Sequence, residues 1–294
     1  MSLNNSIRLL VSMILNLLLS IIELVGGIFS FSLALISDAI HNLSDFFSIL
    51  LSYIANIFGK RKQNKIKTFG YKRAEILAAF VNSVVLLLIS LFIIVEAFIR
   101  ILHPKDINVG VLFWTALVSF LINLFSTLLL HSGKKNNLNI KATYLHILSD
   151  VLASISVLVG SIIMYLTKIK FLDSLLTIVI SIYIICETIP VLRKTIDIFM
   201  QSAPNLPYKQ IEKDIASMNK VTGVHHLHAW MIDESKVILS VHVNMDDLKL
   251  SEVEKVLDNI NRLLKNKYNI CHVTIQPEYQ HGKHNDLFVS NDSF

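Results

Sequence analysis

The chain has 294 residues, of which 53% are hydrophobic and only 17% charged, and its formal net charge is +5. An average soluble domain has roughly a quarter charged residues, so this composition is typical of a protein that lies in a bilayer. The two cysteines, Cys186 and Cys271, are too few and too scattered for a disulfide framework or a cysteine-based zinc ribbon.

Six stretches predict membrane-spanning helices, because each is close to the roughly 20 mostly apolar residues that cross a hydrocarbon core. They cover residues 9–30, 33–58, 76–99, 109–130, 142–166 and 171–192. The first is longer than a signal-peptide core, and no small-residue cleavage site follows it before the second. Residues 1–203 are therefore expected to form a six-helix transmembrane bundle.

The distribution of Lys and Arg predicts how these helices are oriented, because short cytoplasmic loops carry the excess positive charge. Seven cations and no acidic residue separate the second and third stretches: Lys60, Arg61, Lys62, Lys65, Lys67, Lys72 and Arg73. Basic residues also follow the fourth and sixth stretches, at Lys134, Lys135, Lys141, Arg193 and Lys194. Both termini are then cytoplasmic. The seven cations of the first loop alone exceed the net charge of +5, so the net charge gives no support to nucleic-acid binding.

The chain becomes polar after Pro204 and Pro207, two residues that end helices. Helical spacing predicts helices at 208–218 and 251–265, and alternation predicts strands at 224–232, 236–244 and 271–276. Residues 204–280 are thus predicted to form a small α+β domain of αββαβ order. A polar, His-containing tail follows at 281–294.

The second and fifth membrane stretches share the motif H-x-L-S-D, at His41 to Asp45 and at His146 to Asp150. Residues four apart lie on one face of a helix, so each helix offers one nitrogen and one carboxylate. An Asp near the bilayer centre costs on the order of 2.5–3.5 kcal/mol, which a bound cation would offset. A His₂Asp₂ set suits tetrahedral Zn²⁺, while Cd²⁺, Co²⁺ and Fe²⁺ also fit. The alternative is two buried His–Asp couples that pack a helix interface.

Other acidic residues in the membrane stretches are less informative. Asp38 lies about one turn before His41, where it is a relay for ions or protons, a helix cap or a buried carboxylate. Asp173 and Glu75 begin helices and are explained by the helix dipole. Glu23, Glu96 and Glu187 have no His partner, and we assign them no role.

Several segments resemble the cation diffusion facilitator family, and within it the zinc-transporting branch. They are S-D-A-I-H-N-L-S-D at 37–45, F-G-Y-K-R-A-E-I-L-A-A-F-V-N at 69–82, L-N-I-K-A-T-Y-L-H-I-L-S-D at 138–150, G-V-H-H-L-H-A-W at 223–230 and H-V-T-I-Q-P-E at 272–278. The resemblance spans nearly the whole chain in order. By motif position, His41, Asp45, His146 and Asp150 take the transport-site roles.

The resemblance implies a homodimeric transporter, not an enzyme, that exports Zn²⁺ in exchange for protons by alternating access. It also implies a ferredoxin-like, metallochaperone-like cytoplasmic domain with Zn²⁺ as regulatory ligand at His225, His242 and Glu278. Gln276 stands where some bacterial members have a histidine. His226, His228, His281 and His284 either fill a shell around this site or are plain surface histidines, and we favour the surface. A further metal site in the 59–74 loop is not expected, because the loop contains neither His nor Asp.

Three other functions would also use these side chains or this membrane location. An intramembrane metalloprotease lacks its H-E-x-x-H motif here, and a His₂Asp₂ set leaves no general base. A haem protein with His41 and His146 as axial ligands leaves Asp45 and Asp150 unexplained. A passive divalent-cation channel would use the same carboxylates and stays open. The short tail favours a plasma membrane or bacterial inner membrane.

Overall fold

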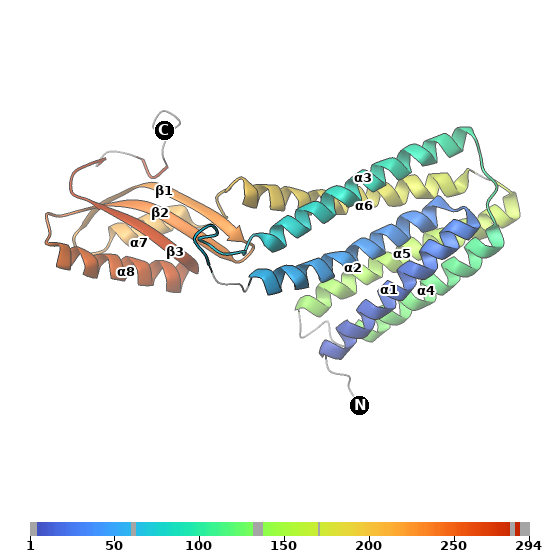
Figure 1. The fold of residues 1–294 in the computed structure, drawn as a ribbon, viewed down its shortest axis with the longest axis horizontal. Helices are drawn as coiled ribbons and strands as arrows, with labels where there is room; N and C mark the ends of the chain where they lie inside the picture. The colour runs from blue at the N-terminus through green and yellow to red at the C-terminus, as the bar shows by residue number, and fades with distance from the viewer. Residues whose placement is uncertain (1–4, 60–62, 132–137, 170, 283–285, 289–294) are drawn as a thin grey trace. The chain divides into compact units, whose positions relative to one another are not determined.

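The computed structural model describes residues 5–59, 63–131, 138–169, 171–282 and 286–288. Six long helices precede a small mixed α and β region (Figure 1). The helices are α1 (Asn5–Ser30), α2 (Leu33–Gly59), α3 (Ala74–Leu102), α4 (Val109–His131), α5 (Leu138–Thr167) and α6 (Leu172–Phe199). The chain divides into two compact units, one of Met1–Ala55 with Ala78–Leu192, the other of Asn56–Leu77 with Arg193–Phe294.

All six helices are long and apolar enough to cross a membrane, which confirms the predicted bundle. The largest difference is at α6, which continues through Pro190 to Phe199 rather than ending at residue 192. A proline in a long helix removes one backbone hydrogen bond, and neighbouring helices compensate for it in a membrane. Arg193 and Lys194 are good helix formers, so the basic residues that mark the end of the span extend the helix.

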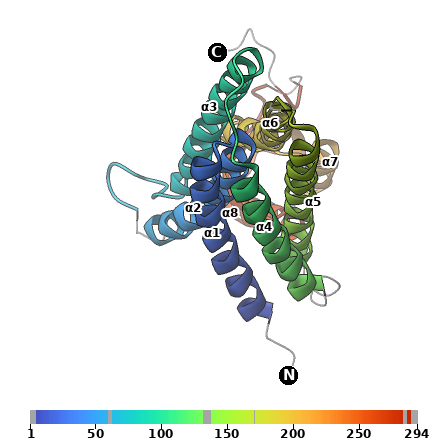
Figure 2. The same cartoon turned by 90° about the vertical axis from the view of Figure 1, so that its right-hand side faces the viewer.

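Small residues bring the helices of the first unit close together. Figure 2 shows α4 between α1 and α5, and α4 packs against both. A β-carbon added at Gly26 on α1 would lie 2.4 Å from the Thr115 side chain on α4, and one added at Gly160 on α5 would lie 2.3 Å from Leu176 on α6. Helices in a membrane associate through such close backbone approach.

The second unit contains α7 (Tyr208–Ala216), β1 (Val221–Asp233), β2 (Lys236–Met245), α8 (Leu250–Tyr268) and β3 (Ile270–Glu278), which confirms the αββαβ order. Strands β1 and β2 are antiparallel, and β3 runs parallel to β2 after the α8 crossover. Side chains of α7 and α8 pack with Leu239, Val241 and Val243 in one core. Because side chains alternate along a strand, His242 lies on the opposite face of the sheet.

Candidate metal centres

The two H-x-L-S-D motifs meet inside the first unit. His41 and Asp45 on α2 and His146 on α5 each offer a ligand atom, and these three atoms lie within 4.8 Å of one another. Asp45 Oδ2 is 2.9 Å from His146 Nε2, a hydrogen bond between the two helices, and 3.7 Å from His41 Nε2. Helix packing has therefore joined residues that lie 101 positions apart.

Asp150, the fourth predicted ligand, lies beside the group that the other three form. Its Oδ2 is 3.9 Å from His146 Nε2, although Asp150 lies outside the three-residue group that converges most tightly. Asp150 Oδ2 and both ring nitrogens of His41 are buried without a hydrogen-bond partner among the described residues. Since an unsatisfied buried polar atom costs about 1–3 kcal/mol, Asp150 Oδ2 and one nitrogen of His41 fit a cation that binds both.

Exposure divides the four side chains into two pairs. Asp45 and His146 are 29% and 32% exposed, whereas His41 and Asp150 are 6% and 2% exposed. Asp45 lies closer to the Gly59 end of α2 than His41 does, and His146 lies closer to the Leu138 end of α5 than Asp150 does. These two ends lie at the same end of the bundle (Figure 1). The more exposed pair therefore lies toward that end of the bundle, and the more buried pair lies away from it.

A second group forms on the face of the sheet that the helices leave uncovered. His225 on β1, His242 on β2 and Glu278 on β3 have ligand atoms within 4.8 Å of one another. Glu278 lies between the two rings, with Oε2 3.1 Å from His225 Nε2 and Oε1 3.0 Å from His242 Nδ1. The contact to His225 lacks hydrogen-bond geometry, so Glu278 Oε2 is a buried acceptor without a donor.

Strand register explains this convergence. His225 pairs directly with His242 across β1 and β2, and Asn244, two residues after His242, pairs with Glu278 on β3. The three side chains therefore project from neighbouring positions of one sheet face. Burial lowers the pKa of His242 despite the opposing pull of Glu278, which favours the neutral imidazole that binds metals.

A β-bulge adds more histidines to this group. The register shifts between His225 and His228, and His226 has a positive φ of 50°. The His226 ring stacks on His242 with centroids 4.4 Å apart, and its edge contacts His228. Both are half-buried, so neither is a fully exposed side chain. His281 is exposed, and His284 lies outside the described residues.

Comparisons with known proteins agree with both halves of this arrangement. Residues 9–200 match the model of the cation efflux transmembrane domain, and residues 203–280 match that of the cation efflux protein cytoplasmic domain. The chain belongs to the cation diffusion facilitator family. It is therefore a multi-pass membrane transporter of divalent metal cations.

Three relatives of this cation diffusion facilitator are bacterial proteins. It is 37% identical to the cadmium, cobalt and zinc/H⁺-K⁺ antiporter of Bacillus subtilis, over 96% of this chain and 91% of the relative. It is 36% identical to the metal cation efflux system protein CzcD of Cupriavidus metallidurans, over 88% of this chain and 82% of that protein. It is 34% identical to the zinc transporter ZitB of Escherichia coli, over 95% of this chain and 90% of that protein.

The structure of this cation diffusion facilitator also shows a buried polar network around Glu23, to which sequence reasoning gave no role. Glu23 is fully buried on α1, and its carboxylate accepts hydrogen bonds from Asn42 on α2, at 3.0 Å, and from Ser119 on α4. The Ser119 hydroxyl is also within hydrogen-bond distance of the Ser154 hydroxyl on α5, at 3.1 Å. Asp38, the candidate relay, is also buried, at 3% exposure. Three other apolar spans contain polar residues, and this sequence signal could have indicated hydrogen-bond partners for Glu23.

Two further side chains hold α2 in place. Asp173, in the first turn of α6, accepts a hydrogen bond from the Leu33 amide at 2.9 Å and another from the Ser32 hydroxyl. It therefore caps the start of α2 as well as beginning its own helix. Asn82 on α3 donates to the hydroxyls of Ser44, at 2.9 Å, and Ser48, at 2.7 Å. Both contacts fix the helix that carries His41 and Asp45.

Proposed function

We propose that this protein exports Zn²⁺ in exchange for protons, with His41, Asp45, His146 and Asp150 as the transport site. The observation that carries the proposal is the convergence of three of these side chains within 4.8 Å, beside the unpartnered atoms of His41 and Asp150. Two imidazoles and two carboxylates match the tetrahedral preference of Zn²⁺. Cd²⁺ and Co²⁺, which the names of two relatives include, are the next candidates, followed by Fe²⁺.

The contact between Asp45 and His146 supports coupling to protons. At 2.9 Å the two atoms share a hydrogen bond, so one proton lies between Asp45 Oδ2 and His146 Nε2. A metal ion that binds both atoms must displace that proton, because ligands bind in their deprotonated form. Binding of Zn²⁺ therefore releases a proton, and the return of a proton to this pair weakens the hold on the metal.

The division of exposure supports alternating access. The exposed pair, Asp45 and His146, faces the end of the bundle that the Lys-rich segments mark as cytoplasmic, whereas His41 and Asp150 are closed off. The structure then corresponds to the state that loads metal from the cytoplasm. In this proposal both termini are cytoplasmic, the protein lies in a plasma membrane or bacterial inner membrane, and Zn²⁺ leaves on the opposite side.

The cytoplasmic domain is proposed to dimerise the protein and to sense Zn²⁺ through His225, His242 and Glu278. The matched cytoplasmic domain model and the buried, unpartnered oxygen of Glu278 support this role. Truncation before residue 205 tests it. We expect the truncated protein to lose both the dimer and its response to zinc, and retention of both would contradict the role.

The transport proposal is tested in proteoliposomes with an internal zinc dye and an imposed pH gradient. Uphill zinc movement is expected for the natural protein, whereas a passive channel would only equalise zinc. His41→Ala and Asp45→Ala should abolish zinc-dependent proton flux. Ser156→Ala is the matched control, since this exposed serine on α5 bonds only to a carbonyl of its own helix. Flux retained by His41→Ala would show that the site lies elsewhere.

A further inference from the structure

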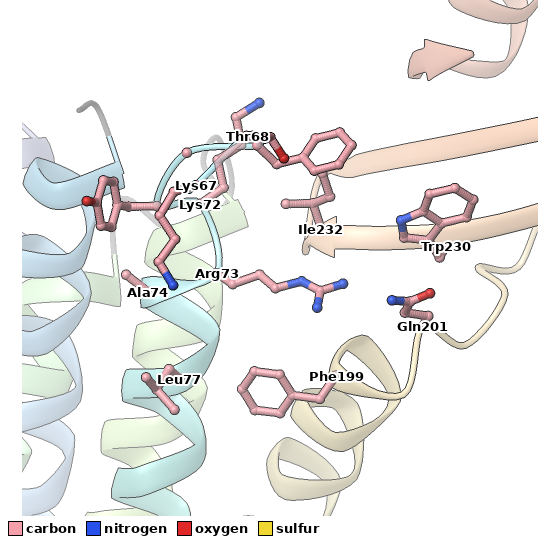
Figure 3. A pocket seen from close by; sticks show the side chains of 13 residues that line it. Lys67, Thr68, Lys72, Arg73, Ala74, Leu77, Phe199, Gln201, Trp230 and Ile232 are labelled. Atoms are coloured by element: carbon pink, nitrogen blue, oxygen red, sulfur yellow. The ribbon is translucent and has the colours of Figure 1, made fainter. Parts of the chain in front are cut away.

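A cavity of about 530 Å³ lies in the second unit, on the face of the sheet that α7 and α8 leave uncovered. The segment from Lys67 to Ala74 forms one wall, and the end of α6 with strand β1 forms the other (Figure 3). Trp230 and Ile232 face it because they alternate with core residues such as Ala229. None of the proposed metal ligands lines this cavity.

The cavity is basic. Lys67, Lys72 and Arg73 contribute to its lining, and the whole connection from residue 59 to residue 74 has seven cations and no acidic residue. Figure 3 shows Arg73 extending from the start of α3 toward Trp230 and Gln201. The Arg73 side chain is half-buried, yet among the described residues no carboxylate lies within ion-pair distance of it.

Some basic residues elsewhere in this unit pair with carboxylates. Lys220 pairs with Glu252 at 3.0 Å, Lys236 with Asp233 at 2.7 Å, and Lys267 with Asp214. Arg73 has no such partner although it is half-buried in a cavity, and its planar guanidinium is the side chain best suited to bind a phosphate through two parallel hydrogen bonds. Its charge can therefore pair with an anion other than the described carboxylates.

The rest of the lining indicates where that anion comes from. Phe69, Phe199 and Trp230 give the cavity aromatic walls, and the apolar side chains of Ile66 and Met200 nearby are 86% and 74% exposed. Arg73 directly precedes Ala74, the first residue of a membrane-spanning helix. It therefore lies at the level of lipid headgroups, where aromatic and basic side chains contact the bilayer interface together. A free phosphate ion would make no use of the apolar walls.

We propose that this pocket binds the phosphodiester headgroup of an anionic phospholipid from the adjoining leaflet, held by Arg73 with Lys72 and packed against Trp230. The bound headgroup neutralises the unpaired guanidinium. It also ties the connection between α2 and α3 to strand β1. Membrane proteins commonly bind acidic lipids in basic pockets of this kind on the cytoplasmic side.

The test uses the full-length protein in vesicles, with Trp230 as the reporter. The sequence has two tryptophans, so Trp114→Phe leaves Trp230 as the only one. Phosphatidylglycerol brominated on acyl carbons near the glycerol should quench Trp230 more than equally brominated phosphatidylcholine. Arg73→Ala should weaken this preference about fivefold, the value of one basic residue near an acidic membrane. Arg73→Lys should fall between the two, and Lys265→Ala, which removes a cation from α8, should leave the preference unchanged.

Each other outcome contradicts the proposal. Equal quenching by the two lipids in the natural pocket, which needs no variant beyond Trp114→Phe, would show that no acidic headgroup binds. Relief of quenching by millimolar glycerol phosphate would identify the ligand as a soluble phosphate. Loss of the dimer in Arg73→Ala with an unchanged lipid preference would show that an acidic group of a second copy occupies the pocket. Lys72→Ala repeats the measurement if Arg73→Ala does not fold.

Discussion

The two candidate metal centres use similar ligands on different secondary structure. In the membrane unit, His41 and Asp45 on α2 face His146 and Asp150 on α5, so two separate helices supply the site. In the cytoplasmic unit, His225, His242 and Glu278 lie on three hydrogen-bonded strands, and strand register fixes their separation. A change in helix packing would alter the first set, whereas separation of the second would require the strands to part.

The two centres also differ in how many of their buried polar atoms lack a hydrogen-bond partner. The membrane site has three buried polar atoms without a partner, on His41 and Asp150, and two half-exposed side chains. In the cytoplasmic site one carboxylate contacts both histidines, and a single atom, Glu278 Oε2, lacks a donor. The first arrangement suits a site that must release its ion, and the second suits a site that retains it. The following experiments test this contrast, beginning with the largest expected effect.

Of the substitutions that compare the two centres, Asp150→Asn should reduce zinc transport the most. Asparagine keeps the size of the side chain but removes the negative charge that lies 3.9 Å from His146. Loss of a ligand should exceed the 10 to 100-fold effect typical of residues that only orient ligands, so we expect a loss of about 100-fold or more. Zinc flux in proteoliposomes measures it, with Ser156→Ala as the control. Near-normal flux would restrict the site to His41, Asp45 and His146.

Glu278→Ala should act on the cytoplasmic centre alone. It removes the carboxylate that lies between His225 and His242, and we expect zinc affinity of this domain to fall at least about tenfold. Transport at saturating zinc should fall much less than in Asp150→Asn, because the helices that carry the transport site are unchanged. Calorimetric zinc titration and flux assays on the same preparation separate the two effects. Equal loss of flux in both variants would contradict the division into a releasing and a retaining site.

The sequence predicted the helices, the αββαβ order and the four residues of the membrane motifs, because hydropathy and the four-residue spacing are local signals. It could not predict that Asp45 and His146 are exposed while His41 and Asp150 are buried, since this depends on how helices pack. The cytoplasmic ligands came from family resemblance alone, because their convergence needs the register of three strands. The bulge at His226 was also beyond prediction, since a positive φ at a residue other than glycine is rare.

Glu23→Ala should have an intermediate effect, on stability more than on transport. The substitution leaves Asn42 and Ser119 without their acceptor in a buried position, which costs about 1–3 kcal/mol. The thermal unfolding temperature in detergent should fall, and Glu23→Gln, which keeps a side-chain oxygen, should restore much of it. Loss of transport at an unchanged unfolding temperature would instead place Glu23 on the path of the ion or the proton.

Asp214→Asn should have the smallest effect on the stability of the protein, and this effect should depend on pH. Asp214, on the surface of the cytoplasmic domain, accepts hydrogen bonds from Lys267, Tyr268 and Gln210, which lower its pKa from 3.8 to about 2. A carboxyl group with a lower pKa in the folded state stabilises that state above its unfolded pKa, and this contribution disappears as the pH falls toward the folded pKa.

The natural domain should therefore be slightly more stable than the Asp214→Asn variant at neutral pH, by a constant amount down to about pH 5. Between about pH 5 and pH 1 the difference should shrink progressively to nothing. Urea unfolding of residues 203–294 measures it, since the domain has its own hydrophobic core and Trp230 is its only tryptophan. Added salt should reduce the difference, because exposed ion pairs are screened. A difference that is undiminished at about pH 2 would mean that side-chain packing, and not the charge of Asp214, links α7 to α8.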